Sequence, residues 1–167
     1  MLKIVALVST LALSLSVAPA LAQSATKIGQ YNSWGTYSYP AKEGKVCYVL
    51  TVPTEKQPER LDHGDIYFFV SQRPGQERSY EPQFIASYDL KDDSKVSVTV
   101  AGKSFSMFTR GKSAWVENAA DEPALIAAMR AGSDMKISAT SKRGNPTNYT
   151  FSLKGISAAL SSITQCR

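Results

Sequence analysis

The sequence contains few of the residues from which catalytic and metal sites are usually built. Its 167 residues include one histidine, His63, and two cysteines, Cys47 and Cys166. Protein zinc sites ordinarily use three or four ligands, and His63 has only Asp62 and Asp65 beside it. No Gly-x-Ser-x-Gly turn occurs that would indicate a Ser-His-Asp hydrolase. We therefore expect no catalytic residues, no cofactor and no metal.

Long apolar runs are also missing after the first 22 residues. Those residues combine Lys3, an apolar run over Ile4–Val17 and the exit Ala20-Leu21-Ala22. This pattern is typical of a secretory signal peptide cleaved after Ala22, with an uncleaved anchor as the alternative. The rest, residues 23–167, has the length of a single domain, and we expect no transmembrane span in it.

Charge is nearly balanced, with 19 basic and 14 acidic residues. Such mild basicity suits an anionic envelope or host surface and does not call for nucleic acid. We therefore expect an envelope or host-surface component of unknown identity as the partner, and no nucleic acid.

If the chain is exported, its two cysteines can form a disulfide bond. Disulfides persist in the periplasm and outside the cell, whereas cytosolic thiols stay reduced. The simplest expectation is one bond between Cys47 and Cys166, which would tie the C-terminus to an early strand. An intermolecular bond and two buried free thiols are the alternatives.

Apolar residues alternate with polar ones through most of the chain, which indicates β-strands. We expect a mainly β fold, an antiparallel β-sandwich or a barrel-like domain, with one or two short helices near 121–131 and 156–165. In the first helix Asp121 would be the N-cap and Gly132 would follow the end. The run Val46–Val52 is apolar at almost every position and predicts a central strand buried on both faces. The other strands are expected at 28–39, 66–71, 84–90, 135–139 and 149–153, with a hairpin over 96–109 and a short strand at 114–116.

Four aromatic residues crowd the first expected strand: Tyr31, Trp34, Tyr37 and Tyr39. We interpret them as core and edge packing, and a carbohydrate-stacking platform is the alternative. Residues 54–65 are polar and predict an exposed loop that contains His63.

A basic turn, Ser141-Lys-Arg-Gly-Asn-Pro146, connects two expected strands. Gly and Asn-Pro favour a tight turn with outward side chains. Lys142 and Arg143 are therefore candidate surface contacts for anionic groups. The alternative is that both are simply solvated charges.

Several segments together resemble small exported members of the invasion-associated locus B (IalB) family of α-proteobacteria. The resemblance lies in Trp34 within Tyr31–Gly35, in Gly44–Val49, in Ala114–Val116 with Leu125–Gly132, and in Phe151–Leu160 before Cys166.

The resemblance implies one β-rich domain over residues 23–167, located in the periplasm or on the outer cell surface. Some members take part in host-cell entry, so the expected function is a non-enzymatic envelope or surface protein that contributes to host interaction. Many members have a cysteine shortly after the tryptophan, where this chain has Thr36, Tyr37 and Ser38. The alternative function is a periplasmic enzyme or inhibitor whose site is assembled from dispersed carboxylates such as Asp62, Asp65, Asp92 and Asp93.

Overall fold

In the part of the chain that the structure describes, eleven antiparallel strands form one continuous sheet. The structure, a computed structural model, describes residues 24–42, 44–72 and 79–164. The strands are β1 (Thr26–Tyr31), β2 (Trp34–Ala41), β3 (Gly44–Thr51), β4 (Glu55–Gln57), β5 (Ile66–Gln72), β6 (Tyr80–Ala86), β7 (Lys95–Val100), β8 (Lys103–Arg110), β9 (Ser113–Val116), β10 (Asp134–Thr140) and β11 (Pro146–Ser152). Their order in the sheet is β1-β2-β3-β5-β6-β9-β8-β7-β10-β11-β4, so β1 and β4 are its edges.

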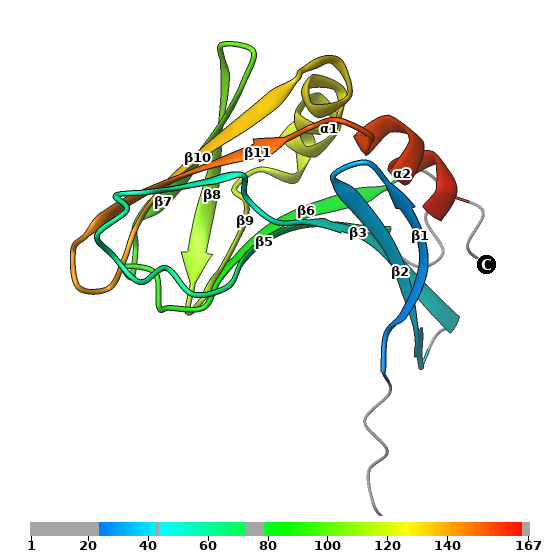
Figure 1. Cartoon of the computed structure of the whole chain (residues 1–167), viewed down its shortest axis with the longest axis horizontal. Coiled ribbons are helices and arrows are strands. Elements are labelled where there is room, and N and C mark those ends of the chain that lie inside the picture. The colour runs from blue at the N-terminus through cyan, green and yellow to red at the C-terminus, as the bar shows by residue number, and fades with distance from the viewer. Residues whose placement is uncertain (1–23, 43, 73–78, 165–167) are drawn as a thin grey trace, which may run out of the picture.

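The sheet bends so strongly that strands from its two halves pack against each other (Figure 1). The ring centroids of Phe68 on β5 and Phe151 on β11 lie 6.1 Å apart, and those of Phe84 on β6 and Tyr149 on β11 lie 5.6 Å apart. Four strands separate β6 from β11 in the sheet order, so folding of the sheet brings these rings together. The two edges do not pair, so the barrel-like shape is not closed. The predicted mainly β, antiparallel fold is confirmed.

Two helices cover the same end of the sheet (Figure 1). They are α1 (Glu122–Ala131), which packs against β6, and α2 (Ile156–Ile163), which packs against β1, β2 and β3. Both predicted helices are confirmed over these residues, and Gly132 follows the end of α1 as expected. Asp121 occupies the N-cap position of α1 as expected, but its side chain makes no capping hydrogen bond. Instead a 3-10 turn, Ala119–Asp121, precedes α1, and the Asn118 side chain accepts from the Ala120 amide.

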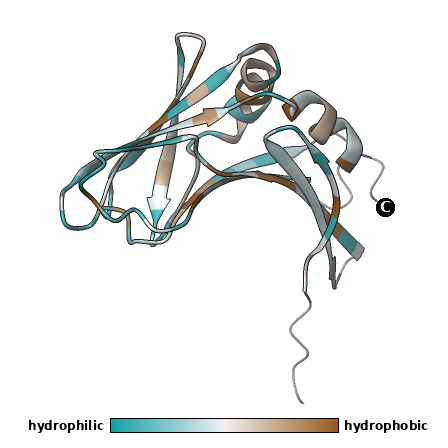
Figure 2. Cartoon of the chain, viewed as in Figure 1, coloured by the Kyte–Doolittle hydropathy of each residue, from teal (hydrophilic) through white to brown (hydrophobic). Residues whose placement is uncertain are grey.

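Strand β3 is buried on one face only, so the prediction of burial on both faces is wrong. Cys47, Val49 and Thr51 are buried, whereas Tyr48 and Leu50 between them are half-buried. Alternation along the strands is visible as alternating colours in Figure 2. On the outer face of β3, side chains contact neighbouring rings instead of a second layer of the fold. A strand has a similar composition in both situations, so its composition does not predict which one occurs.

The first expected strand consists of two strands, β1 and β2, joined by a turn at Asn32 and Ser33. Trp34 begins β2 with 0% of its surface exposed, and its indole N–H donates to the Ser152 carbonyl at 3.0 Å. Packing is therefore confirmed for Trp34. Tyr37 and Tyr39, in contrast, lie on the outer face beside Tyr48.

The expected exposed loop over residues 54–65 contains the short edge strand β4 and a buried histidine. His63 is 5% exposed, because β11 packs over its ring from a distant part of the sequence. The expectation that His63 is exposed is wrong.

Two sequence predictions concern residues outside the described ranges. The signal peptide, residues 1–22, and Cys166 are among them, so cleavage after Ala22 and the Cys47–Cys166 bond stay predictions. Cys47 itself is buried on the inner face of β3, the face toward which α2 packs. Within the described ranges, no helix has the length and apolar character needed to cross a membrane.

Candidate functional site

The basic turn between β10 and β11 is held by its own hydrogen bonds. The Ser141 amide donates to the Asn145 carbonyl at 2.9 Å, and the Gly144 amide donates to the Ser141 carbonyl at 2.8 Å. The Asn145 amide also donates to the Ser141 hydroxyl at 3.1 Å. Gly144 has φ +86°, which a residue without Cβ adopts with little strain. The sequence-predicted turn is thus present, with Lys142 and Arg143 exposed at its tip.

A neighbouring segment fixes the turn against the body of the protein. The Lys142 amide donates to the Asp89 carbonyl at 2.8 Å, and the Lys91 amide donates to the Thr140 carbonyl at 2.9 Å. Leu90, which is buried, forms an isolated bridge with Ser141. The backbone that carries the two cations is therefore anchored on both sides.

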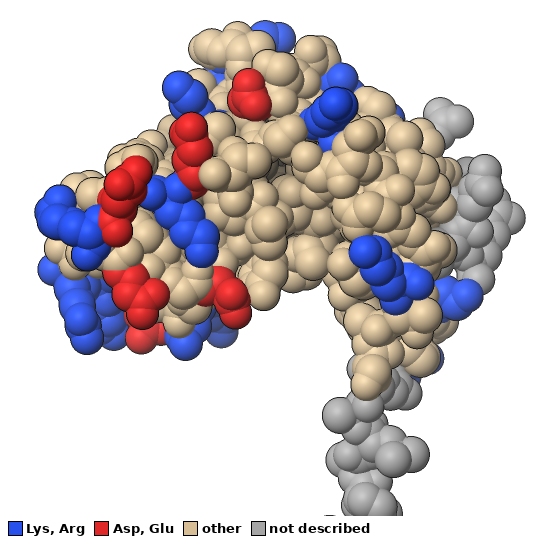
Figure 3. All heavy atoms as spheres, viewed as in Figure 1, with Lys and Arg blue, Asp and Glu red and all other residues tan. Residues whose placement is uncertain are grey.

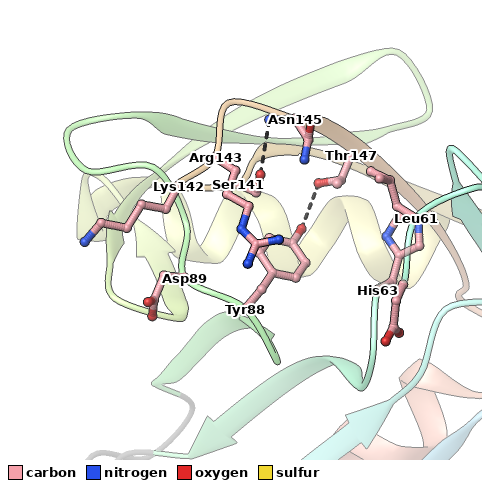
Figure 4. A pocket seen from close by; sticks show the side chains of 10 residues that line it. Leu61, His63, Tyr88, Asp89, Ser141, Lys142, Arg143, Asn145 and Thr147 are labelled. Carbon is pink, nitrogen blue, oxygen red and sulfur yellow. Dashed lines mark hydrogen bonds between the residues drawn. The ribbon is translucent and has the colours of Figure 1, made fainter.

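A pocket of about 440 Å³ opens beside this turn (Figure 4). Lys142 extends away from the other labelled side chains in Figure 4, whereas Arg143 turns toward Tyr88. The pocket is lined by Leu61, Asp62, His63, Tyr88, Asp89, Ser141, Lys142, Arg143, Asn145 and Thr147. It thus combines cationic, amide and hydroxyl groups with two carboxylates, Asp62 and Asp89, around an uncharged floor of His63, Tyr88 and Thr147.

The cations at the pocket are well hydrated. Lys142 Nζ lies 3.6 Å from Asp92 Oδ2, and the two side chains are 62% and 71% exposed. Exposed pairs of this kind contribute little to stability, typically below about 1 kcal/mol. Figure 3 shows Lys and Arg gathered, with interspersed acidic residues, at the end of the molecule that carries the β10–β11 turn. Lys142 is therefore available to a stronger anionic partner.

A buried chain of hydrogen bonds forms the floor of the pocket. His63 Nδ1 lies 2.9 Å from the Tyr149 hydroxyl, which lies 2.7 Å from the Tyr88 hydroxyl. The Tyr88 hydroxyl also lies 2.8 Å from Thr147 Oγ1. His63 Nε2 is 3.0 Å from the Pro58 carbonyl, which can only accept. In the neutral imidazole Nε2 therefore carries the hydrogen, and Nδ1 accepts from Tyr149.

The electrostatics of this floor keep Tyr149 in its protonated form. Burial, together with the hydrogen bond and charge of Tyr88, raises the pKa of Tyr149 well above its usual range. The phenol therefore stays protonated at neutral pH. It positions the imidazole and Tyr88 but supplies no base.

The four carboxylates considered for an enzymatic site are dispersed. Asp62 lines the pocket, Asp92 lies beside Lys142, and Asp65 and Asp93 are exposed. Among the residues that the structure describes, no group of three or more His, Cys, Asp or Glu could hold a metal ion.

Sequence reasoning identified the rim of the site but missed its floor. Lys142 and Arg143 belong to one local turn, which its composition predicts. Tyr88 and Tyr149 are 61 residues apart and His63 and Tyr149 are 86 apart, so no local pattern joins them. The sequence shows only that each of these positions has an aromatic side chain. Aromatic residues are common in strands, so this does not predict the buried chain of hydrogen bonds.

Comparison with known proteins places this geometry in a family. The family model described as invasion associated locus B (IalB) protein matches residues 34–164. A crystal structure of invasion associated protein B from Bartonella henselae is similar in fold, with a TM-score of 0.57 and 17% sequence identity over 81% of this chain and 94% of that chain. No curated protein matches the sequence. Because the family match covers well over half of the sequence, including the basic turn and both helices, the chain belongs to the invasion associated locus B (IalB) family.

Proposed function

We propose that the chain is an exported, non-enzymatic envelope or surface protein that contributes to host-cell interaction. Its basic turn would contact anionic groups of an envelope or host surface. The observation that carries this proposal is the position of Lys142 and Arg143 on an anchored turn at the mouth of a pocket. Family membership supports the host-related role, because the family is described as invasion associated.

The anchored backbone makes the turn a better anion contact than two cations on a free loop. A flexible loop would lose conformational entropy on binding, whereas this turn is already ordered by its hydrogen bonds. Asn145 lines the same pocket, and its side-chain amide can donate hydrogen bonds to the oxygens of an anion. Binding should still be modest, because each exposed charge contributes only about 1 kcal/mol near an anionic surface.

Vesicle binding tests the proposal. We expect the protein to bind phosphatidylglycerol vesicles at low salt and to lose binding at high salt, since screening acts within about 8 Å at physiological salt. Replacing both Lys142→Ala and Arg143→Ala should weaken binding by up to roughly 30-fold at low salt. Cosedimentation at two salt concentrations measures both effects.

The matched control removes the same net charge elsewhere. Lys103 and Lys136 are exposed and do not line the pocket. The variant K103A/K136A should bind nearly as well as the original protein. Equal losses in the two double variants would mean that net charge alone attracts the vesicles, and no loss in K142A/R143A would leave the turn as solvated surface.

A further inference from the structure

A band of aromatic rings covers the outer face of the sheet, far from the features described above. The band consists of Tyr37 and Tyr39 on β2, Tyr48 on β3, and Tyr67 and Phe69 on β5. Tyr37 stacks on Tyr48 with a centroid distance of 5.3 Å and an interplanar angle of 14°. Tyr48 and Phe69 lie 5.5 Å apart, and Tyr67 and Phe69 lie 5.9 Å apart. The ring centroids of Tyr39 and Tyr48 lie 6.2 Å apart. These contacts join the five rings into one surface.

The aromatic band is only half-buried and carries no formal charge. Four of its rings are partly exposed and Tyr39 is exposed. Cross-strand pairing adds Leu50, Gln83 and Ile85 to the same face, all partly exposed and all uncharged. Two charged residues lie beside the band: Lys27, which pairs with Tyr37, and Glu81, which pairs with Ser71. Burial and the neighbouring phenols Tyr37 and Tyr39 raise the pKa of Tyr48, so this phenol stays neutral at moderately alkaline pH. On the five rings themselves a charged ligand would lose hydration without gaining a counter-charge, so the aromatic band favours an uncharged ligand.

The shape of this face disfavours a twofold contact with the same face of a second copy. The arch formed by β3 and β5 is seen nearly edge-on in Figure 1, with the helices and β11 on its upper side and an open hollow beneath it. Figure 3 shows this hollow as a notch with a roof of uncharged residues. A concave surface does not fit the same concave surface of another copy, as a twofold interface would require. The occupant must be slender enough to enter the hollow.

A second group of rings extends the face across the sheet. Gln83 on β6 pairs with Phe69 on one side and with Trp115 on β9 on the other, and Trp115 pairs with Phe108 on β8. The rings of Phe108 and Trp115 stack at 5.7 Å and 26°. Four strand-to-strand steps from β3 to β8 span about 19 Å along the surface. An elongated ligand could therefore contact both groups of rings.

A shallow pocket of about 410 Å³ lies at the Trp115 end of this row. Arg110 and three carboxylates, Glu81, Glu117 and Glu122, line it together with the Phe108 and Trp115 rings. Carboxylates accept hydrogen bonds and a guanidinium donates them. The pocket therefore provides both acceptors and donors beside the aromatic rings.

We propose that this outer face binds an uncharged, linear sugar chain. A pyranose ring has an apolar C–H face and a rim of hydroxyl groups. The aromatic rings can pack against the C–H face of the sugar. The tyrosine hydroxyls, Gln83, Glu81 and Arg110 can form hydrogen bonds with its hydroxyl groups. The absence of charge in the aromatic band, its narrow concave shape and the polar pocket at one end together select this occupant over a flat apolar protein surface.

Direct binding of neutral hexasaccharides tests the proposal. Cellohexaose, chitohexaose and maltohexaose are titrated into the protein by calorimetry, and tryptophan emission is recorded in parallel. Trp34 is buried and Trp115 is partly exposed, so a sugar on the outer face should shift the emission of Trp115. We expect saturable binding of at least one hexasaccharide. The variant Trp115→Phe should lose the spectral shift while calorimetry still detects binding.

Variants separate this surface from the rest of the molecule. Tyr48→Ala should weaken binding about three- to tenfold, the value of one lost ring contact. Ile28→Ala, which removes an apolar side chain that is 52% exposed and outside the aromatic band, should leave affinity unchanged. K142A/R143A should also bind sugar normally, which separates this proposal from the anionic contact.

Two results would overturn the proposal. One is the lack of saturable binding of all three hexasaccharides at millimolar concentration, which would favour a protein partner. The other is equal affinity of the original protein and a Tyr48→Ala variant shown by its thermal transition to be folded.

Discussion

At the scale of single residues, the hydroxyl of Tyr149 has the most connections in the site. It joins His63 from the segment before β5 to Tyr88 from the segment after β6, and its ring packs against Phe84. Three segments distant in sequence thus depend on one phenol for their relative positions. Removal of a bonded partner inside a protein costs more than the bond gains, because the remaining polar groups stay buried without water.

Replacing Tyr149→Phe should lower the free energy of unfolding by about 1 to 3 kcal/mol, since His63 Nδ1 and the Tyr88 hydroxyl each lose a partner. Urea denaturation measures the change. The control is Tyr67→Phe, which removes a hydroxyl from a partly exposed ring on the outer face and should change stability by less than about 0.5 kcal/mol. Equal stability of Y149F and the original protein would show that water replaces the phenol in the chain of hydrogen bonds.

At the scale of elements, the junction between β11 and α2 is the tightest contact of two backbones. Gly155 precedes α2 with φ +96°, and a Cβ placed there would lie 2.0 Å from the Tyr31 carbonyl oxygen. The adjacent Ser33 amide donates to the Lys154 carbonyl at 3.2 Å. The β1–β2 turn therefore seats directly on the start of the last helix, and only glycine fits between them.

A pair of glycine variants tests this contact. Gly144 also has positive φ, at +86°, but a Cβ there would meet nothing within 4 Å. Gly144→Ala should therefore cost only the conformational strain, about 1 to 2 kcal/mol. Gly155→Ala carries a similar strain and must also displace the β1–β2 turn, so its thermal midpoint should fall clearly further. Equal midpoints for the two variants would contradict the close approach.

The elements differ in how far the sequence predicts them. The hairpin of β7 and β8 follows from the alternation of Val96, Val98 and Val100 and from the turn Ala101-Gly102, where both residues have positive φ. The helices follow from their apolar spacing in the same way. The partial exposure of the outer face of β3 does not follow from the sequence, because a half-buried aromatic strand and a fully buried strand have similar compositions. The Lys142 and Arg143 rim is local and was predictable, whereas burial of His63 requires Tyr149 to arrive from 86 residues away.

At the scale of the whole molecule, the last segment closes onto the first strands. Helix α2 buries Ile156, Ala159, Leu160 and Ile163 and packs on β1, β2 and β3. Since Cys47 is buried on β3, this arrangement supports the proposed bond to Cys166, three residues after the end of α2. Such a bond would hold both ends of the fold together.

Replacing Cys166→Ser should lower the free energy of unfolding by about 2 to 5 kcal/mol under oxidising conditions. The original protein should lose a similar amount on reduction, and the variant should be insensitive to reductant. Chemical denaturation with and without dithiothreitol measures both. Reaction of both cysteines with a thiol label in the unreduced, denatured protein would exclude the bond.

The hydrogen bond from the Trp34 indole to the Ser152 carbonyl also determines when the chain can fold. Its two residues are 118 positions apart in the sequence. The edge strand β4 pairs only with β11 in the sheet, so it has no strand partner until β11 has been synthesised. Such non-local pairing slows folding, because a long loop must close before any contact compensates for it. A chain emerging from the ribosome therefore cannot complete its core until nearly the last residues have been made. That delay keeps the polypeptide extended for longer, a state that would suit the proposed export through a secretion channel.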